Sequence, residues 1–195
     1  QSIGIILKTT NNGANWNEVA NYNYRLNDLT VFPNGIAYIC GGSSKFLKST
    51  DYGDSWIAFS IYGIGGYTDY SSLSFKNERN GLIGGITTLN GTYQALKSID
   101  GGNNWSIIFN PSGSMSRRIQ MVDSNIFYIV GTSVYKTINS GLNWTQFNLP
   151  TNHRYGLHFF NKDTGLVGGG PTLRTTNGGT NWSQVYFQDG ATISN

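Results

Sequence analysis

One nine-residue pattern occurs five times in this chain and accounts for all five of its tryptophans. Each copy has a basic residue, a hydroxyl residue, an Asp or Asn, a Gly and a Trp at fixed spacing, as in Lys48-Ser49-x-Asp51-x-Gly53-x-x-Trp56. Successive tryptophans are 40, 49, 39 and 38 residues apart. A period of this length is typical of repeat architectures, and because it runs from end to end it predicts one repeated domain over residues 1–195.

The composition favours strands over helices. Aromatic residues make up 14% of the chain and glycine fills 26 positions, whereas charged residues make up only 12%. This mixture suits short strands joined by tight turns. The lone cysteine, Cys40, lies in an apolar run at 36–40 and is expected to be a buried small hydrophobe.

Each complete repeat contains four strand-like segments, which are clearest in the third repeat. Runs at 73–75, 81–85, 93–97 and 105–109 are separated by turn-forming residues. Four antiparallel strands that recur about every 40 residues predict an all-β fold, a β-propeller of four-stranded antiparallel blades. The blade units are expected at approximately 1–20, 27–60, 71–110, 117–149 and 156–188.

The motif falls in the hairpin between the third and fourth strands, where a structural role is predicted. The Asp or Asn side chain can accept backbone N–H groups, the Gly can take positive φ, the hydroxyl can bond locally and the Trp can cover the turn. Three copies carry Asn where a metal site would need a carboxylate, which argues against metal binding. The positions given this structural role are Asn11, Gly13, Trp16, Asp51, Gly53, Trp56, Asp100, Gly102, Trp105, Asn139, Gly141, Trp144, Asn177, Gly179 and Trp182.

The pattern Ser-x-Asp-x-Gly-x-x-Trp resembles the Asp-box, or BNR repeat, of sialidases, sortilin-type receptors and bacterial surface propellers. The longer pattern at 165–182, from Gly-Leu through Thr-Thr-Asn-Gly-Gly to Asn-Trp, is similar to propellers related to the photosystem II assembly factor Ycf48. The resemblance implies a propeller fold and an extracellular, cell-surface or periplasmic location. It does not fix a function, because one fold can carry unrelated activities.

The repeats do not make whole blades at both ends. The first motif begins after only seven residues, which leaves room for the third and fourth strands of its blade but not for the first two. The chain therefore holds about four and a half to five blades. We favour part of a larger ring of six to eight blades, completed by further blades or a partner chain, because an open end would expose strand edges and apolar faces. A ring whose closing blade has three strands is the alternative.

The loops that lead from each fourth strand to the next first strand are rich in tyrosine and arginine. These loops open on the rim opposite the motif turns, and both residue types are favoured at binding hot spots. We therefore predict that this rim binds a protein or a glycan, with an anionic ligand favoured. Packing of the tyrosines on their own sheets is the alternative. The predicted ligand-binding residues are Tyr22, Tyr24, Arg25, Tyr62, Tyr67, Tyr70, Arg117, Arg118, His153, Arg154 and Tyr155.

The basic residue that opens each motif copy has a different predicted environment. Alternation along the third strand is expected to turn these side chains outward, to a solvated face near the periphery. They are Lys8, Lys48, Lys97, Lys136 and Arg174.

No catalytic, metal or cofactor site is predicted. Sialidase-like chemistry needs an acid at the ring centre, but the only two glutamates, Glu18 and Glu78, are expected away from it, and the aspartates show no paired setting. His153 and His158 lack Cys or acidic partners at metal-ligand spacing. The net charge of +3 is too mild to predict nucleic-acid binding, and no apolar stretch approaches the length of a membrane span.

The sequence thus favours a non-enzymatic binding module that recognises a protein or a glycan through its Tyr- and Arg-rich rim. Two alternatives stay open. One is a fragment of a sialidase-like or other glycoside hydrolase whose catalytic residues lie outside this chain. The other is an assembly factor that docks a membrane protein complex, as the second resemblance implies.

Overall fold

The computed structural model describes residues 4–63, 66–89, 91–111, 116–149, 154–169 and 171–185. These residues form strands and turns without a helix. In chain order the strands are β1 (Gly4–Lys8), β2 (Asn17–Tyr22), β3 (Leu26–Val31), β4 (Ala37–Gly41), β5 (Lys45–Ser49), β6 (Ile57–Ser60), β7 (Thr68–Phe75), β8 (Gly81–Thr87), β9 (Tyr93–Ser98), β10 (Ser106–Phe109), β11 (Ser116–Met121), β12 (Phe127–Gly131), β13 (Ser133–Thr137), β14 (Thr145–Asn148), β15 (Arg154–Phe159), β16 (Gly165–Gly169), β17 (Thr172–Thr175) and β18 (Ser183–Val185).

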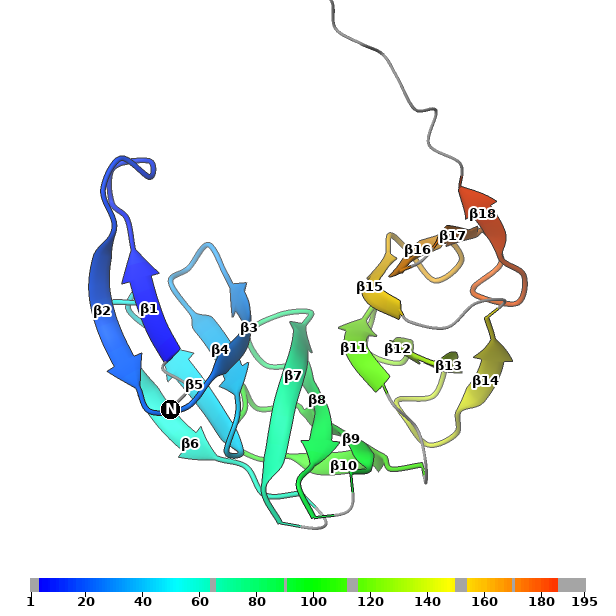
Figure 1. Ribbon diagram of the computed structural model, residues 1–195, viewed down its shortest axis with the longest axis horizontal. Coiled ribbons are helices and arrows are strands. Elements are labelled where there is room, and N and C mark those ends of the chain that lie inside the picture. Colours follow the sequence, from blue (N-terminus) through cyan, green and yellow to red (C-terminus); the bar gives the residue numbers. More distant parts are fainter. Residues whose placement is uncertain are drawn as a thin grey trace, which may run out of the picture.

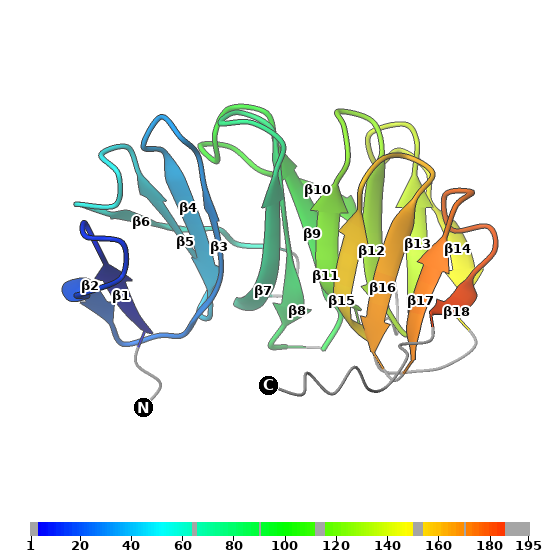
Figure 2. The same cartoon turned by 90° about the horizontal axis from the view of Figure 1, so that it is seen from above.

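The strands form the blades of a β-propeller, which confirms the predicted fold. Strands β3 to β6, β7 to β10, β11 to β14 and β15 to β18 make four sheets of four antiparallel strands, and β1 pairs with β2 in a two-stranded sheet. The sheets stand side by side along an open arc, with β3, β7, β11 and β15 on its concave side (Figure 1). The view turned by 90° shows the β3–β4 and β5–β6 turns along one rim and the β2-to-β3 link along the other (Figure 2).

Apolar side chains fill the space between neighbouring four-stranded blades. Strand β4 reads Ala-Tyr-Ile-Cys-Gly and is buried along its whole length, as expected for a strand covered on both faces. Tyr38 and Phe46 of one blade pack against Leu73 and Phe75 of the next. Cys40 lies in the same cluster as a buried free thiol, which confirms its predicted burial.

The innermost strands are joined from blade to blade by side chains that bond to the neighbouring backbone. Asp28 on β3 accepts a hydrogen bond from the Leu73 amide at 2.9 Å. Gln120 on β11 accepts from the Phe159 amide at 2.6 Å and donates to the Phe159 carbonyl at 2.9 Å. Because the backbone N–H and C=O groups of Phe159 are both hydrogen-bonded to one side chain, Gln120 fixes β15 relative to β11.

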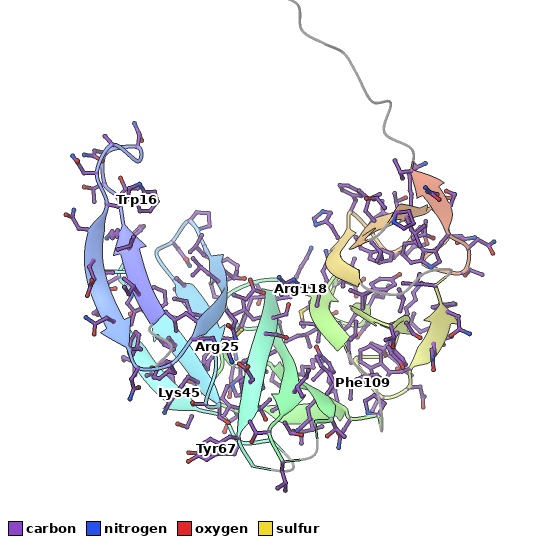
Figure 3. The ribbon with its side chains drawn as sticks, viewed as in Figure 1. Trp16, Arg25, Lys45, Tyr67, Phe109 and Arg118 are labelled. Atoms are coloured by element: carbon purple, nitrogen blue, oxygen red, sulfur yellow. The ribbon has the colours of Figure 1, made fainter. Side chains whose placement is uncertain are left out.

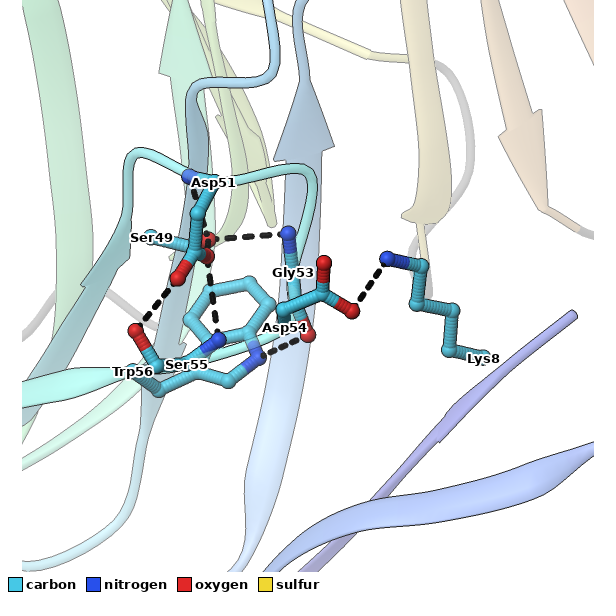
Figure 4. A network of polar contacts seen from close by, with 7 residues as sticks. All are labelled: Lys8, Ser49, Asp51, Gly53, Asp54, Ser55 and Trp56. Carbon is cyan, nitrogen blue, oxygen red and sulfur yellow. Dashed lines mark hydrogen bonds and ion pairs between the residues drawn. The ribbon is translucent and has the colours of Figure 1, made fainter. Parts of the chain in front are cut away.

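The hydroxyl and Asp or Asn side chains make the same turn bonds in every motif copy, and the Trp-to-Gly bond forms in the second, third and fourth copies; the second copy is shown in Figure 4. The Ser49 hydroxyl donates to Asp51 Oδ1 at 2.8 Å and accepts the Gly53 amide at 2.9 Å. Asp51 Oδ1 accepts the Ser55 amide at 3.0 Å, and Trp56 donates through Nε1 to the Gly53 carbonyl at 3.2 Å. Gly53 has φ of +81°, a conformation that suits glycine. The hydrogen bonds of the Ser55 side chain and amide, followed by that of Ser49, lower the pKa of Asp51 to about 2.

The basic residue before the motif is not on a solvated face in the first four copies, so that prediction is wrong for them. Lys48 donates through Nζ to the carbonyl of Gly101, in the motif turn of the next blade, at 3.4 Å. Lys97 Nζ lies 5.3 Å from the ring centre of Phe127, also in the next blade. The third strand does alternate, but the following blade covers the face on which these side chains lie. Arg174, on the last blade, is exposed.

Candidate functional site

The link between β2 and β3 carries the first part of the predicted rim. The rings of Tyr22 and Tyr24 stack with their centres 5.1 Å apart and their planes at 28°. Lys45 Nζ, at the start of β5, lies 5.8 Å from the ring centre of Tyr24 and donates to Ser60 Oγ at 2.8 Å. Desolvation, and then the neighbouring Tyr22, raise the pKa of Tyr24 to about 12. The two tyrosines are therefore neutral at physiological pH and offer rings and hydroxyl groups.

Arg25 continues this surface and is tied to the next blade. Its Nη2 lies 3.2 Å from Asp69 Oδ2 on β7, and its side chain is mostly exposed. Asn27 donates through Nδ2 to Asp69 Oδ1 at 3.1 Å and to the Tyr70 carbonyl at 2.8 Å. Asp69 thus pairs with one end of the guanidinium, and most of the Arg25 side chain stays exposed to solvent.

The third part comes from the link between β6 and β7. Tyr62 and Tyr67 are exposed, and their rings meet edge to face with centres 5.9 Å apart. Their position is fixed by Ser44, which follows β4: the Ser44 amide donates to the Thr68 carbonyl at 2.8 Å, and the Thr68 amide donates to Ser44 Oγ at 2.8 Å. Lys45 and Tyr67 thus lie beside Ser44 and Thr68, whose hydrogen bonds join the β4–β5 loop to the β6–β7 link.

We call the resulting surface the aromatic-basic patch. Figure 3 labels Arg25, Lys45 and Tyr67 on the same side of the arc, where the second blade meets the third. Sequence reasoning missed Lys45, although its place directly after a second-to-third-strand loop, on the same rim, was an available signal. The patch consists of Tyr22, Tyr24, Arg25, Lys45, Tyr62, Tyr67 and Asp69.

The other predicted binding residues are not brought into this patch. Tyr70 is wholly buried and donates to the Ile61 carbonyl at 3.1 Å, so its assignment to a binding surface is wrong. The reason is the alternation along β7, which turns Tyr70 into the core between the half-buried Asp69 and Ser71. Arg118 is half-buried and donates through Nη1 to the Ser71 carbonyl at 2.9 Å, so it ties β11 to β7.

Four predicted binding residues have no described side chain. His153 lies outside the described residues. Arg117, Arg154 and Tyr155 lie on strands, but their side chains are outside the described part of the structure.

The described residues contain no group of three or more His, Cys, Asp and Glu side chains that could hold a metal ion. In the same part of the chain, no helix is long and apolar enough to cross a membrane.

Comparisons with known proteins find similarity in structure. No protein-family model matches the chain, and no curated protein matches it. The structure of YCF48 bound to D1 peptide has a TM-score of 0.54 and 14% identity, over 82% of this chain and 81% of that chain. YCF48 from Cyanidioschyzon merolae has a TM-score of 0.66 and 17% identity, over 82% of this chain and 55% of that chain. The GH74 enzyme of Niastella koreensis has a TM-score of 0.59 and 23% identity, over 82% of this chain and 24% of that chain.

These similarities establish the propeller fold. The matched part is about half of the Cyanidioschyzon protein and about a quarter of the GH74 enzyme. At identities of 14 to 23%, the likeness to one protein that binds a peptide and to another that is an enzyme leaves the activity of this chain open.

Proposed function

We propose that this protein is a non-enzymatic binding module and that its aromatic-basic patch recognises a segment of a partner protein. The observation that carries the proposal is the convergence of three loops, which place two exposed tyrosines beside a stacked tyrosine pair and two cations. Tyrosine and arginine dominate binding hot spots, because they combine large rigid contact area with directional hydrogen bonds. An acidic partner segment is favoured by Arg25 and Lys45.

A similar structure, that of YCF48 bound to D1 peptide, supports a peptide ligand for a propeller of this kind. An assembly factor that docks a membrane protein complex would be one form of such binding. We further propose a location outside the cytoplasm, which is supported by the resemblance to bacterial surface propellers.

The test is selection of peptides from a random phage-displayed library on the immobilised protein, followed by affinity measurements on the selected peptides. Tyr67→Ala and Arg25→Ala are each expected to weaken binding at least about tenfold, as at other hot spots. Trp16→Ala is the matched control, because Trp16 is equally exposed but lies on the opposite rim. Selected peptides that bind both patch variants as tightly as the original protein would contradict the proposal, as would binding to a glycan array alone.

The likeness to the GH74 enzyme supports a second candidate, a glycoside hydrolase fragment. Glycoside hydrolysis commonly uses two carboxylates across the scissile bond. In the patch, the one carboxylate is Asp69, which is already paired with Arg25. Release of reducing sugar from any of a panel of polysaccharides by this chain alone would favour the hydrolase over the binding module.

A further inference from the structure

The N-terminal sheet has an open edge. Strand β1 pairs with β2 on one side, whereas the corresponding third strands β5, β9, β13 and β17 lie between a second and a fourth strand. In the described part of the chain, the other edge of Gly4–Lys8 has no paired strand. An edge of this kind presents backbone N–H and C=O groups to any strand that can align with it.

The same edge borders an apolar groove. Two adjoining hollows of about 340 and about 430 Å³ lie between β1 and the second blade. Leu29 and Val31 on β3 form the far wall and are 54% and 65% exposed. Ile6 and Leu7 on β1 form the near wall, and Trp56 closes one end.

The interior blade interfaces show what belongs in this groove. Leu73 and Phe75 hold the same positions on β7 as Leu29 and Val31 on β3, and they are only 5% and 9% exposed. They are covered by the second strand of the preceding blade, through Tyr38 and Cys40 of β4. The fourth interface repeats this arrangement, where Phe159 packs on residues of β12. The groove beside β1 therefore lacks a second strand.

We propose that the groove binds a strand of a partner polypeptide, which pairs antiparallel with β1 and covers Leu29 and Val31. Its chemistry follows from the strands that hold this place in complete blades, Tyr38-x-Cys40 on β4, Leu82-x-Gly84 on β8 and Tyr128-x-Val130 on β12. The partner strand carries a large apolar residue, aromatic or leucine, followed two positions later by a small or aliphatic one, so that both point to one face. Main-chain hydrogen bonds to β1 supply affinity, and the groove supplies specificity. This site is separate from the aromatic-basic patch, so neither proposal depends on the other.

The probe is a synthetic, fluorescently labelled peptide of residues 116–131, the β11–β12 hairpin, flanked by lysines for solubility. Saturable one-to-one binding is expected, together with slower hydrogen exchange of the β1 amides. Val31→Asp is expected to weaken binding at least about tenfold, because a buried unpaired carboxylate is costly. The variant should fold, since Val31 is already mostly exposed.

Two controls separate strand pairing from unspecific apolar contact. Leu89→Asp places the same charge on an exposed leucine in the β8–β9 turn and should leave binding unchanged. A probe with proline in place of Ile129 loses a ladder donor and should not bind.

The proposal is overturned by three results. The first is no binding up to about 1 mM peptide, since a specific site of this kind should be tighter. The second is binding that survives Val31→Asp or leaves β1 amides unprotected. The third is protection of β1 amides without any peptide: protection that grows with protein concentration would assign the groove to a second copy, and protection at all concentrations would assign it to this chain's own residues.

Discussion

The first motif turn and the third share the hydrogen bonds of their hydroxyl and Asp or Asn side chains but differ in their surroundings. Thr9 accepts the Gly13 amide at 2.9 Å, and Ser98 accepts the Gly102 amide at 2.9 Å. Trp105 of the third turn is half-buried and meets Phe46 of the preceding blade edge to face, with ring centres 5.3 Å apart. Trp16 of the first turn is 59% exposed. The comparison shows that the turn forms from its own residues, whereas the burial of its tryptophan depends on the preceding blade.

The largest expected difference between the two turns concerns their tryptophans. Trp105→Ala should lower the free energy of unfolding by about 3 kcal/mol, because it leaves a void between two blades. Trp16→Ala should change it by less than about 0.5 kcal/mol, as for an exposed surface position. Urea unfolding followed by circular dichroism measures both, and equal losses would refute the distinction.

The next effect concerns the bonds between innermost strands, which the N-terminal sheet lacks because it has no innermost strand. Gln120→Ala removes two hydrogen bonds to Phe159 and should cost about 2 kcal/mol. Hydrogen exchange at the Phe159 amide should accelerate. Gln146→Ala, which removes an exposed side chain within one blade, is the control and should cost less than about 0.5 kcal/mol. Equal exchange rates in the two variants would show that Gln120 does not join the blades.

A smaller difference is expected when the same hydroxyl is deleted from each turn. Ser98 is buried, so Ser98→Ala should cost about 1 to 2 kcal/mol by leaving the Gly102 amide unsatisfied. Thr9 is half-buried, but its hydrogen bond with the Gly13 amide is exposed, so in Thr9→Ala water can replace the lost acceptor and about 0.5 kcal/mol is expected. Thermal unfolding of the two variants measures this comparison. A larger loss for Thr9→Ala would contradict it.

The smallest effect is the response to acid, because only two turns carry a carboxylate. Hydrogen bonds, first from the Asn104 backbone and then from its side chain, lower the pKa of Asp100 to about 2. A folded-state pKa below the ordinary value of 3.8 means stability that is present above pH 3.8 and is lost as the pH falls towards 2. Asp100→Asn, which copies the first turn, should remove this part of the acid sensitivity. Titration of the Asp100 carboxyl carbon by NMR tests the shift, and a midpoint near 3.8 would contradict it.

Part of the candidate site was predictable and part was not. The Tyr- and Arg-rich loops were visible in the sequence, and Tyr67 and Arg25 do lie on the rim surface. Tyr70, only three residues from Tyr67, is buried instead. Side chains alternate between the two faces of a strand, and Tyr70 lies on the face of β7 that packs into the core. The composition of a loop does not predict which of its residues point into the core. Lys45 was missed because its partner Tyr24 lies in a different loop.

The sequence by itself determined the local structure of this protein. The motif bonds join residues two to four positions apart, so each turn forms from its own residues, and the period of the motif fixes how many turns there are. Only the tertiary structure decided which tryptophans are buried and that Lys48 bonds to the next blade. It also decided that Leu29 and Val31 are exposed to solvent. The physical reason is that these side chains are buried by contacts between adjacent blades, which lie about 40 residues apart in the sequence. A side chain at the end of the arc has no adjacent blade to cover it, although its local sequence is that of a covered position.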